Sequence, residues 1–213
     1  MFADIRALVE RTFLDAISTL DKRPVGVLPE WSVQGLGMLR LYLSRNKTVR
    51  LHVWDRSLLV VGAAPAHTHP WDFSSLVVAG RMRNQRYDVV APDDESLETR
   101  GPHVSWWNGT EILCGPGTHQ TAPGAERVRL KELDMETYYP GETYKQERAE
   151  IHQSFPEDGT VTIVTRTFGP DPDHARVYWR GPEGSPWISA EPHAADPNTV
   201  RTVLLRSLET WWS

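Results

Sequence analysis

The chain has 213 residues and a formal net charge of -5. This acidic balance argues against a nucleic-acid partner, because binding to a phosphate backbone normally requires a basic face. The single cysteine, Cys114, excludes an internal disulfide and a zinc site built from cysteines, and so favours a reducing, cytoplasmic location.

The N-terminal segment predicts an amphipathic helix over residues 1–22. Its apolar residues recur at spacings of three and four, namely Ile5, Leu8, Val9, Phe13, Ala16, Ile17 and Leu20. Acids and arginines interrupt this stripe, so we expect neither a signal peptide nor a membrane span here, and no membrane partner.

The sequence between residues 37 and 180 predicts a β-barrel or β-sandwich. Short runs rich in branched and aromatic residues alternate with Gly, Pro, Asn and Asp, a pattern typical of many short strands. The expected strands are 37–43, 48–54, 57–61, 74–79, 81–90, 126–138, 143–148, 160–168 and 176–180. The sequence "SRNK" at 44–47 predicts a hairpin turn between the first two.

A second amphipathic helix is expected over 196–212. Asp196 can cap its free amides, and Pro197 suits its first turn. The tryptophans of the terminal "ETWWS" are expected to pack this helix, although exposed tryptophans there would indicate a homodimer. The length suits one domain over residues 1–213.

The stretch "APAHTHPWDF" at 64–73 predicts half of a metal site. Side chains alternate along a strand, so His67 and His69 would point the same way, at a spacing that one metal ion can bridge. A third ligand must come from elsewhere in the chain.

Two segments resemble the signatures of the cupin superfamily. Residues 62–80, "GAAPAHTHPWDFSSLVVAG", resemble the first signature, with His-X-His, an acid soon after, and a closing glycine. Residues 141–152, "GETYKQERAEIH", keep the first glycine and the histidine of the second signature, whereas Glu147 and Ala149 replace its inner proline and glycine. The resemblance implies a mainly β fold, a double-stranded β-helix (jelly-roll) barrel holding a metal, with terminal helices.

The metal ligands implied by this resemblance are His67, His69 and His152. His119, in "CGPGTHQT", is the rival third ligand, since "PG" followed by "TH" also echoes the second signature. His52 lies on an expected strand and is interpreted as a hydrogen-bonded histidine of the sheet.

Asp72 is ambiguous. The family's metal-binding glutamate would fall at position 73 or 74, where this chain has Phe73 and Ser74. Strand alternation turns Asp72 away from the histidines, although Pro70 could introduce a bulge that returns it. We expect Asp72 to orient a histidine or cap a turn, and direct ligation stays open.

The alternation of side chains along a strand also predicts which residues lie around the metal. Trp71 and Phe73 share the parity of the histidines and are expected to wall the site. Tyr144 and Arg148 are the candidate substrate-binding and catalytic residues beside Asp72, because an arginine fork can hold an anion. Arg81, Arg83 and their strand neighbours Gln85 and Tyr87 form the other candidate set, in which both arginines are expected to be solvated.

Three histidines with open positions suit Fe(II), Zn(II), Ni(II) or Cu(II). Similar cupins without the glutamate include thiol dioxygenases, although Ser74 and Ser75 occupy the place of the cysteine that some of them crosslink to tyrosine. We therefore expect a mononuclear non-haem Fe(II) dioxygenase that acts on a small, anionic organic substrate. The alternatives are a non-redox zinc or nickel enzyme, an isomerase or hydrolase, and a binding or sensing module without catalysis.

Overall fold

The fold is that of a computed structural model. It describes residues 1–20, 31–34, 36–59, 65–91, 104–115, 118–121, 125–168, 174–180 and 193–212, with the backbone alone at 112–115, 118–121 and 168.

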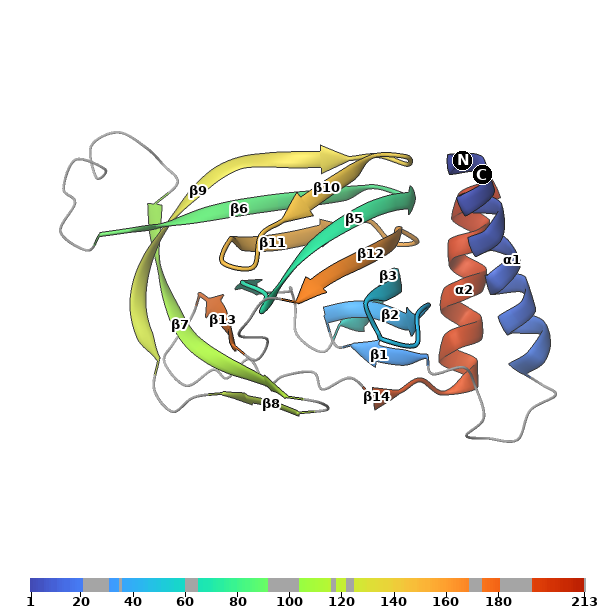
Figure 1. Ribbon diagram of the computed structural model, residues 1–213, viewed down its shortest axis with the longest axis horizontal. Helices are drawn as coiled ribbons and strands as arrows, with labels where there is room; N and C mark the ends of the chain where they lie inside the picture. Colours follow the sequence, from blue (N-terminus) through green and yellow to red (C-terminus); the bar gives the residue numbers. More distant parts are fainter. Residues whose placement is uncertain are drawn as a thin grey trace.

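The first and last elements of the chain are helices, and these two helices lie side by side at one end of the molecule (Figure 1). The helices are α1 (Phe2–Leu20) and α2 (Pro197–Trp212). The strands are β1 (Ser32–Gln34), β2 (Leu36–Tyr42), β3 (Val49–Leu59), β4 (Ala66–His67), β5 (Trp71–Ala79), β6 (Met82–Val90), β7 (Val104–Gly115), β8 (Thr118–Thr121), β9 (Glu126–Tyr138), β10 (Thr143–Gln146), β11 (Ile151–Pro156), β12 (Val161–Phe168), β13 (His174–Trp179) and β14 (His193–Ala194).

The strands form two antiparallel sheets. Sheet A has the order β10-β5-β12-β3-β2-β1-β14, and sheet B has the order β13-β4-β11-β6-β9-β7-β8. In sheet B, β13 also pairs with β7, so six strands close into a barrel from which β8 extends. One buried residue from each of the six strands meets inside, namely Ala66, Tyr87, Trp107, Leu130, Ile151 and Tyr178.

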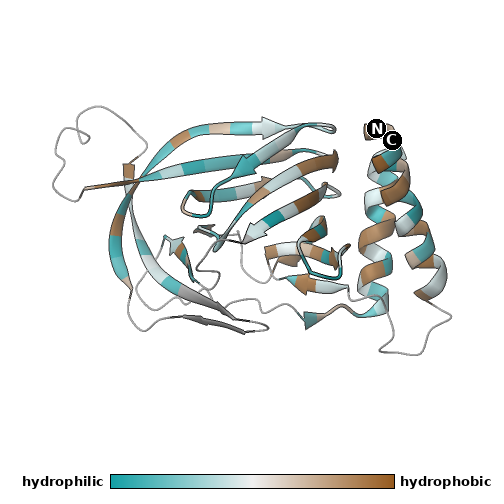
Figure 2. Cartoon of the chain, in the orientation of Figure 1, coloured by the Kyte–Doolittle hydropathy of each residue, from teal (hydrophilic) through white to brown (hydrophobic). Residues whose placement is uncertain are grey.

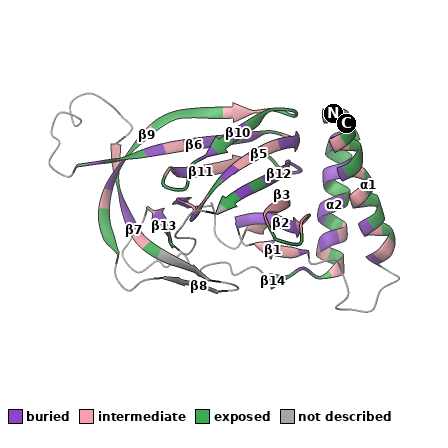
Figure 3. Ribbon diagram, viewed as in Figure 1, coloured by how far each residue is buried: buried purple, intermediate pink, exposed green. Residues whose placement is uncertain are grey.

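The helices cover one face of sheet A. The buried residues of α2 recur at helical spacing and pack with Leu39, Leu51 and Val53 in one apolar cluster. The two helices lie side by side, with their buried and apolar positions turned towards each other and the sheet (Figures 2 and 3). The ring of Phe13 stacks on Trp211 at 5.3 Å, which holds the helices together.

Asp196 caps α2 as expected. Its Oδ1 accepts hydrogen bonds from the amides of Asn198 and Thr199, both at 3.0 Å, and Pro197 begins the helix. Trp211 is buried, whereas Trp212 is exposed and donates its indole N–H to Glu10. The expected packing of "ETWWS" thus holds for Trp211 alone.

The other face of sheet A looks towards sheet B. Phe73, Val77 and Tyr144 of sheet A form one apolar cluster with Met82 of β6. On β11, Ile151 points into the barrel, so His152 points out of it towards sheet A. The face of sheet A that lacks helices and the outside of the barrel therefore enclose the histidines between them.

The prediction of a mainly β chain with a helix at each end is confirmed. The expected strands 48–54 and 57–61 are instead one strand, β3, because the sheet continues through the polar residues at its middle. Six of the observed strands were not predicted, namely β1, β4, β7, β8, β11 and β14. Within the described residues, no helix is long and apolar enough to cross a membrane.

Candidate metal site

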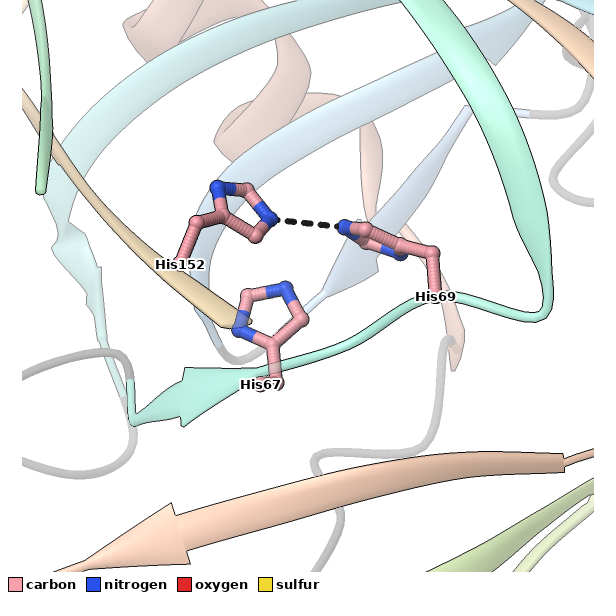
Figure 4. Close-up of side chains that lie close together, drawn as sticks. All are labelled: His67, His69 and His152. Carbon is pink, nitrogen blue, oxygen red and sulfur yellow. Dashed lines mark hydrogen bonds between the residues drawn. The ribbon is translucent and has the colours of Figure 1, made fainter. Parts of the chain in front are cut away.

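The side chains of His67, His69 and His152 converge on one point (Figure 4). One ring nitrogen from each lies within 4.8 Å of the others. His69 Nε2 and His152 Nε2 are 2.9 Å apart, and the ring centroid of His67 is 4.7 Å from each of the other two rings. The predicted ligand set is thus assembled from two distant segments.

Backbone pairing brings these segments together. β11 pairs with β4 so that His152 lies directly opposite His67, and neighbouring side chains on paired strands share one face. β4 ends at His67, so His69 belongs to the connection that follows rather than to a strand, contrary to the expectation of simple alternation. Its amide donates to the Arg148 carbonyl at 3.1 Å, which fixes it beside β10.

His152 is oriented by a buried chain of hydrogen bonds. Its Nδ1 lies 2.8 Å from Asn84 Oδ1, Asn84 Nδ2 donates to Gln146 Oε1 at 3.3 Å, and Gln146 Nε2 donates to the Glu150 carbonyl. A backbone carbonyl can only accept a hydrogen bond, so this last bond determines which group donates and which accepts in the other two hydrogen bonds. Asn84 therefore presents its oxygen, and His152 carries its proton on Nδ1. The Nε2 of His152 faces the cluster as an acceptor, and it takes the 2.9 Å hydrogen bond from His69 Nε2 (Figure 4).

His67 has the same tautomer for a different reason. Its Nδ1–H donates to the Pro65 carbonyl at 2.9 Å, which leaves Nε2 as the acceptor nitrogen. Burial lowers the pKa of all three histidines, and those of His69 and His152 fall well below the ordinary value. The neutral rings favoured here are the form that binds a metal ion.

Two aromatic rings flank the histidines, as alternation predicted. Trp71 lies 5.5 Å from His69 between ring centroids. Phe73 lies 5.0 Å from His69 and 5.9 Å from His152. These apolar faces limit the access of water to the ring nitrogens.

Asp72 lies outside the cluster. It is exposed, whereas Phe73 is buried, so alternation holds without a bulge at this point. Its Oδ1 accepts the amide of Arg148 at 2.9 Å, and the carbonyl of Arg148 accepts the amide of His69. Asp72 thus fixes the turn that holds His69, without a described hydrogen bond to a histidine ring.

The candidate substrate residues are separated by the end of β10. Tyr144 and Gln146 are buried, whereas the side chain of Arg148 is exposed because the strand, and hence the alternation, ends at Gln146. Tyr144 lies against Phe73 at 6.0 Å and stacks on Tyr138 at 4.7 Å, and burial raises its pKa. Its catalytic role and that of Arg148 stay predictions.

The other candidate side chains were those of His119, Arg81 and Arg83. His119 lies on β8 opposite Cys114, and its side chain falls outside the described part of the structure. Arg81 and Arg83 are exposed as expected, with Arg81 bonded to Glu157. On the same strand, Asn84 is the residue that reaches the histidines, and sequence reasoning missed it.

Comparison with known proteins names no relative: no protein-family model matches the sequence, and no curated protein matches it.

Replacing His152 with alanine should lower metal affinity by at least about 100-fold, because it removes a ligand, and the loss should exceed that typical of supporting residues. Metal content after dialysis, measured by atomic emission, tests this. The exposed His174→Ala variant is the control and should keep wild-type affinity. Loss of metal from His119→Ala together with retention by His152→Ala would show that the third ligand is misassigned.

Replacing Asn84 with leucine should weaken metal binding by about 10- to 100-fold, because His152 loses the acceptor that sets its tautomer. Asn84→Asp keeps an oxygen at this place and should retain most of the affinity. Competition with a chromogenic chelator measures both variants, and circular dichroism checks their folding. An equal loss in the two variants would contradict the role of the acceptor.

Proposed function

We propose that this chain is a metal-dependent enzyme with a mononuclear centre held by His67, His69 and His152. The observation that carries the proposal is the convergence of three neutral imidazoles between two sheets. The proposed fold type is the cupin double-stranded β-helix, which the facing antiparallel sheets and the His-X-His segment support.

The separation of the ring nitrogens supports a metal ion at this point. Two nitrogens at adjacent positions of an octahedral ion, each at about 2.1 Å, are about 3.0 Å apart. His69 Nε2 and His152 Nε2 are joined by a hydrogen bond of 2.9 Å, so they already lie at about this separation. His152 and His67 each use Nδ1 to donate, so each keeps Nε2 for coordination.

The three-histidine set leaves coordination positions for a substrate and O2, and the metal we favour is Fe(II). Bound Fe(II) would supply the activation of O2 that an oxidation requires. The protein's own residues hold and orient the ligands: Asn84 sets the tautomer of His152, and Phe73 excludes water beside it. The proposed activity is the oxidation of a small organic anion by O2.

Oxygen uptake by iron-loaded protein tests this activity. We expect at least one class among small thiols, keto acids and diketones to stimulate uptake, and the His67→Ala variant to lose the stimulation because its iron site is incomplete. Zinc-loaded wild-type protein is the matched control and should consume no oxygen. Inactivity across all three classes, or unchanged uptake by His67→Ala, would count against the dioxygenase and favour the non-redox zinc or nickel enzyme.

A further inference from the structure

The outward side of α1 carries exposed apolar residues. Leu8 is 63% exposed and Leu14 is 45% exposed, whereas the buried residues of this helix pack towards α2 and sheet A. Met1 continues the helical turn, since its carbonyl accepts the amide of Ile5 at 3.2 Å. One stripe of exposed residues recurs at spacings of three and four, and we call it the α1 face: Met1, Asp4, Ala7, Leu8, Arg11 and Leu14.

The α1 face also carries two charges that are open to a partner. Arg11 is exposed, and it makes no hydrogen bond or ion pair within the described part of the chain. Asp4 pairs with the terminal amine of Met1 at 2.9 Å, and its side chain is still 87% exposed. Asp4 and Arg11 lie about two helical turns apart, which is too far for them to pair with each other.

The order of these residues along α1 is complementary to itself. Two identical helices can pack antiparallel around a two-fold axis, so that the same surface serves both partners. If the axis passes between Ala7 and Leu8, each residue faces the one at the same distance on the other side of the axis. Asp4 then faces Arg11 of the partner subunit, and Arg11 faces Asp4 of the partner subunit. Opposite charges thus meet at both ends of an apolar centre.

The two edges of the α1 face match as well. With 3.6 residues in each helical turn, Met1 and Leu8 lie along one edge, Ala7 and Leu14 lie along the other, and the two charges lie between them. A two-fold axis normal to the face exchanges its edges. The large Leu8 therefore meets the small Ala7 of the partner subunit, and Met1 meets Leu14 of the partner subunit.

The exposed side of α2 adjoins this surface. Trp212 is 61% exposed, and its indole N–H donates to Glu10 of α1 at 3.0 Å. Leu205 is 41% exposed and lies two turns before Trp212 on the same side of α2. Leu14 follows Glu10 by one turn, so apolar side chains of both helices gather at this end of the molecule (Figures 1 and 3). Adjoining apolar side chains on a surface are typical of interaction sites.

We propose that the chain forms a homodimer through the α1 face, with α1 antiparallel to α1 of the partner subunit around a two-fold axis between Ala7 and Leu8. Burial of the leucines contributes to affinity, and the two ion pairs determine direction and register. A parallel arrangement in register would instead oppose Asp4 to its own copy and Arg11 to its own copy, which is repulsive. The dimer does not depend on the metal site.

Sedimentation equilibrium of the full-length protein, at concentrations between about 1 and about 100 μM, tests the dimer. We expect the wild type to reach twice the mass of one chain. Arg11→Asp opposes two aspartates at each end of the interface and should weaken the dimer about tenfold or more. Arg83→Asp makes the same change of charge at an exposed position of β6, and as the matched control it should dimerise as the wild type does.

The exchange of both charges, Asp4→Arg with Arg11→Asp, restores opposite charges across the axis and should recover most of the lost affinity. Circular dichroism checks that α1 stays helical, and Leu8→Asp repeats the test at the apolar centre if a charge variant loses helix. The proposal is overturned if the wild type is monomeric over the whole range, or if folded Arg11→Asp dimerises as tightly as the wild type. Failure of the exchange to recover the dimer in a folded protein overturns it as well.

Discussion

The pairing of His152 with His67 across β11 and β4 is the contact on which the candidate site depends. His69 and His152 are 83 positions apart in the chain, and only this register brings their rings together. A slip of one residue would turn His152 into the barrel and Ile151 towards sheet A. The apolar filling of the barrel, to which Ile151 belongs, therefore fixes the register that positions the ligand.

Burial has opposite consequences for the charge of the three histidines and for the charge of Arg40, Arg50 and Arg166, which lie on the facing side of sheet A. The histidines are titratable and become neutral on burial, so their lone pairs stay available at no cost in unpaired charge. Arginines cannot release their protons at neutral pH, so burial leaves their charge in place. Trp71 contacts both groups, and it places a neutral, metal-type donor set next to a fixed positive charge.

The three candidate ligands were easier to predict from the sequence than the strands that position them. His-X-His and the distant His152 were identified from spacing and a resemblance, and the helix cap at Asp196 followed from local chemistry. Asn84 could not be identified, because a single asparagine on a strand carries no local signal of a partner 68 positions away. The position of Arg40, Arg50 and Arg166 on one face of sheet A depends on the order of strands in that sheet, which no local pattern encodes. With that order known, the alternation in "MLRLYL", "TVRLHVW" and "TIVTRTF" would have shown one arginine from each strand on a common face.

X-ray absorption at the iron edge of the Fe(II)-loaded protein tests the central claim most directly, because it counts the imidazoles bound to the metal. The account predicts three nitrogen ligands at about 2.1 Å, with the outer-shell scattering that imidazole rings give, and two in His152→Ala. A spectrum with only oxygen ligands, or one that His152→Ala leaves unchanged, would contradict it.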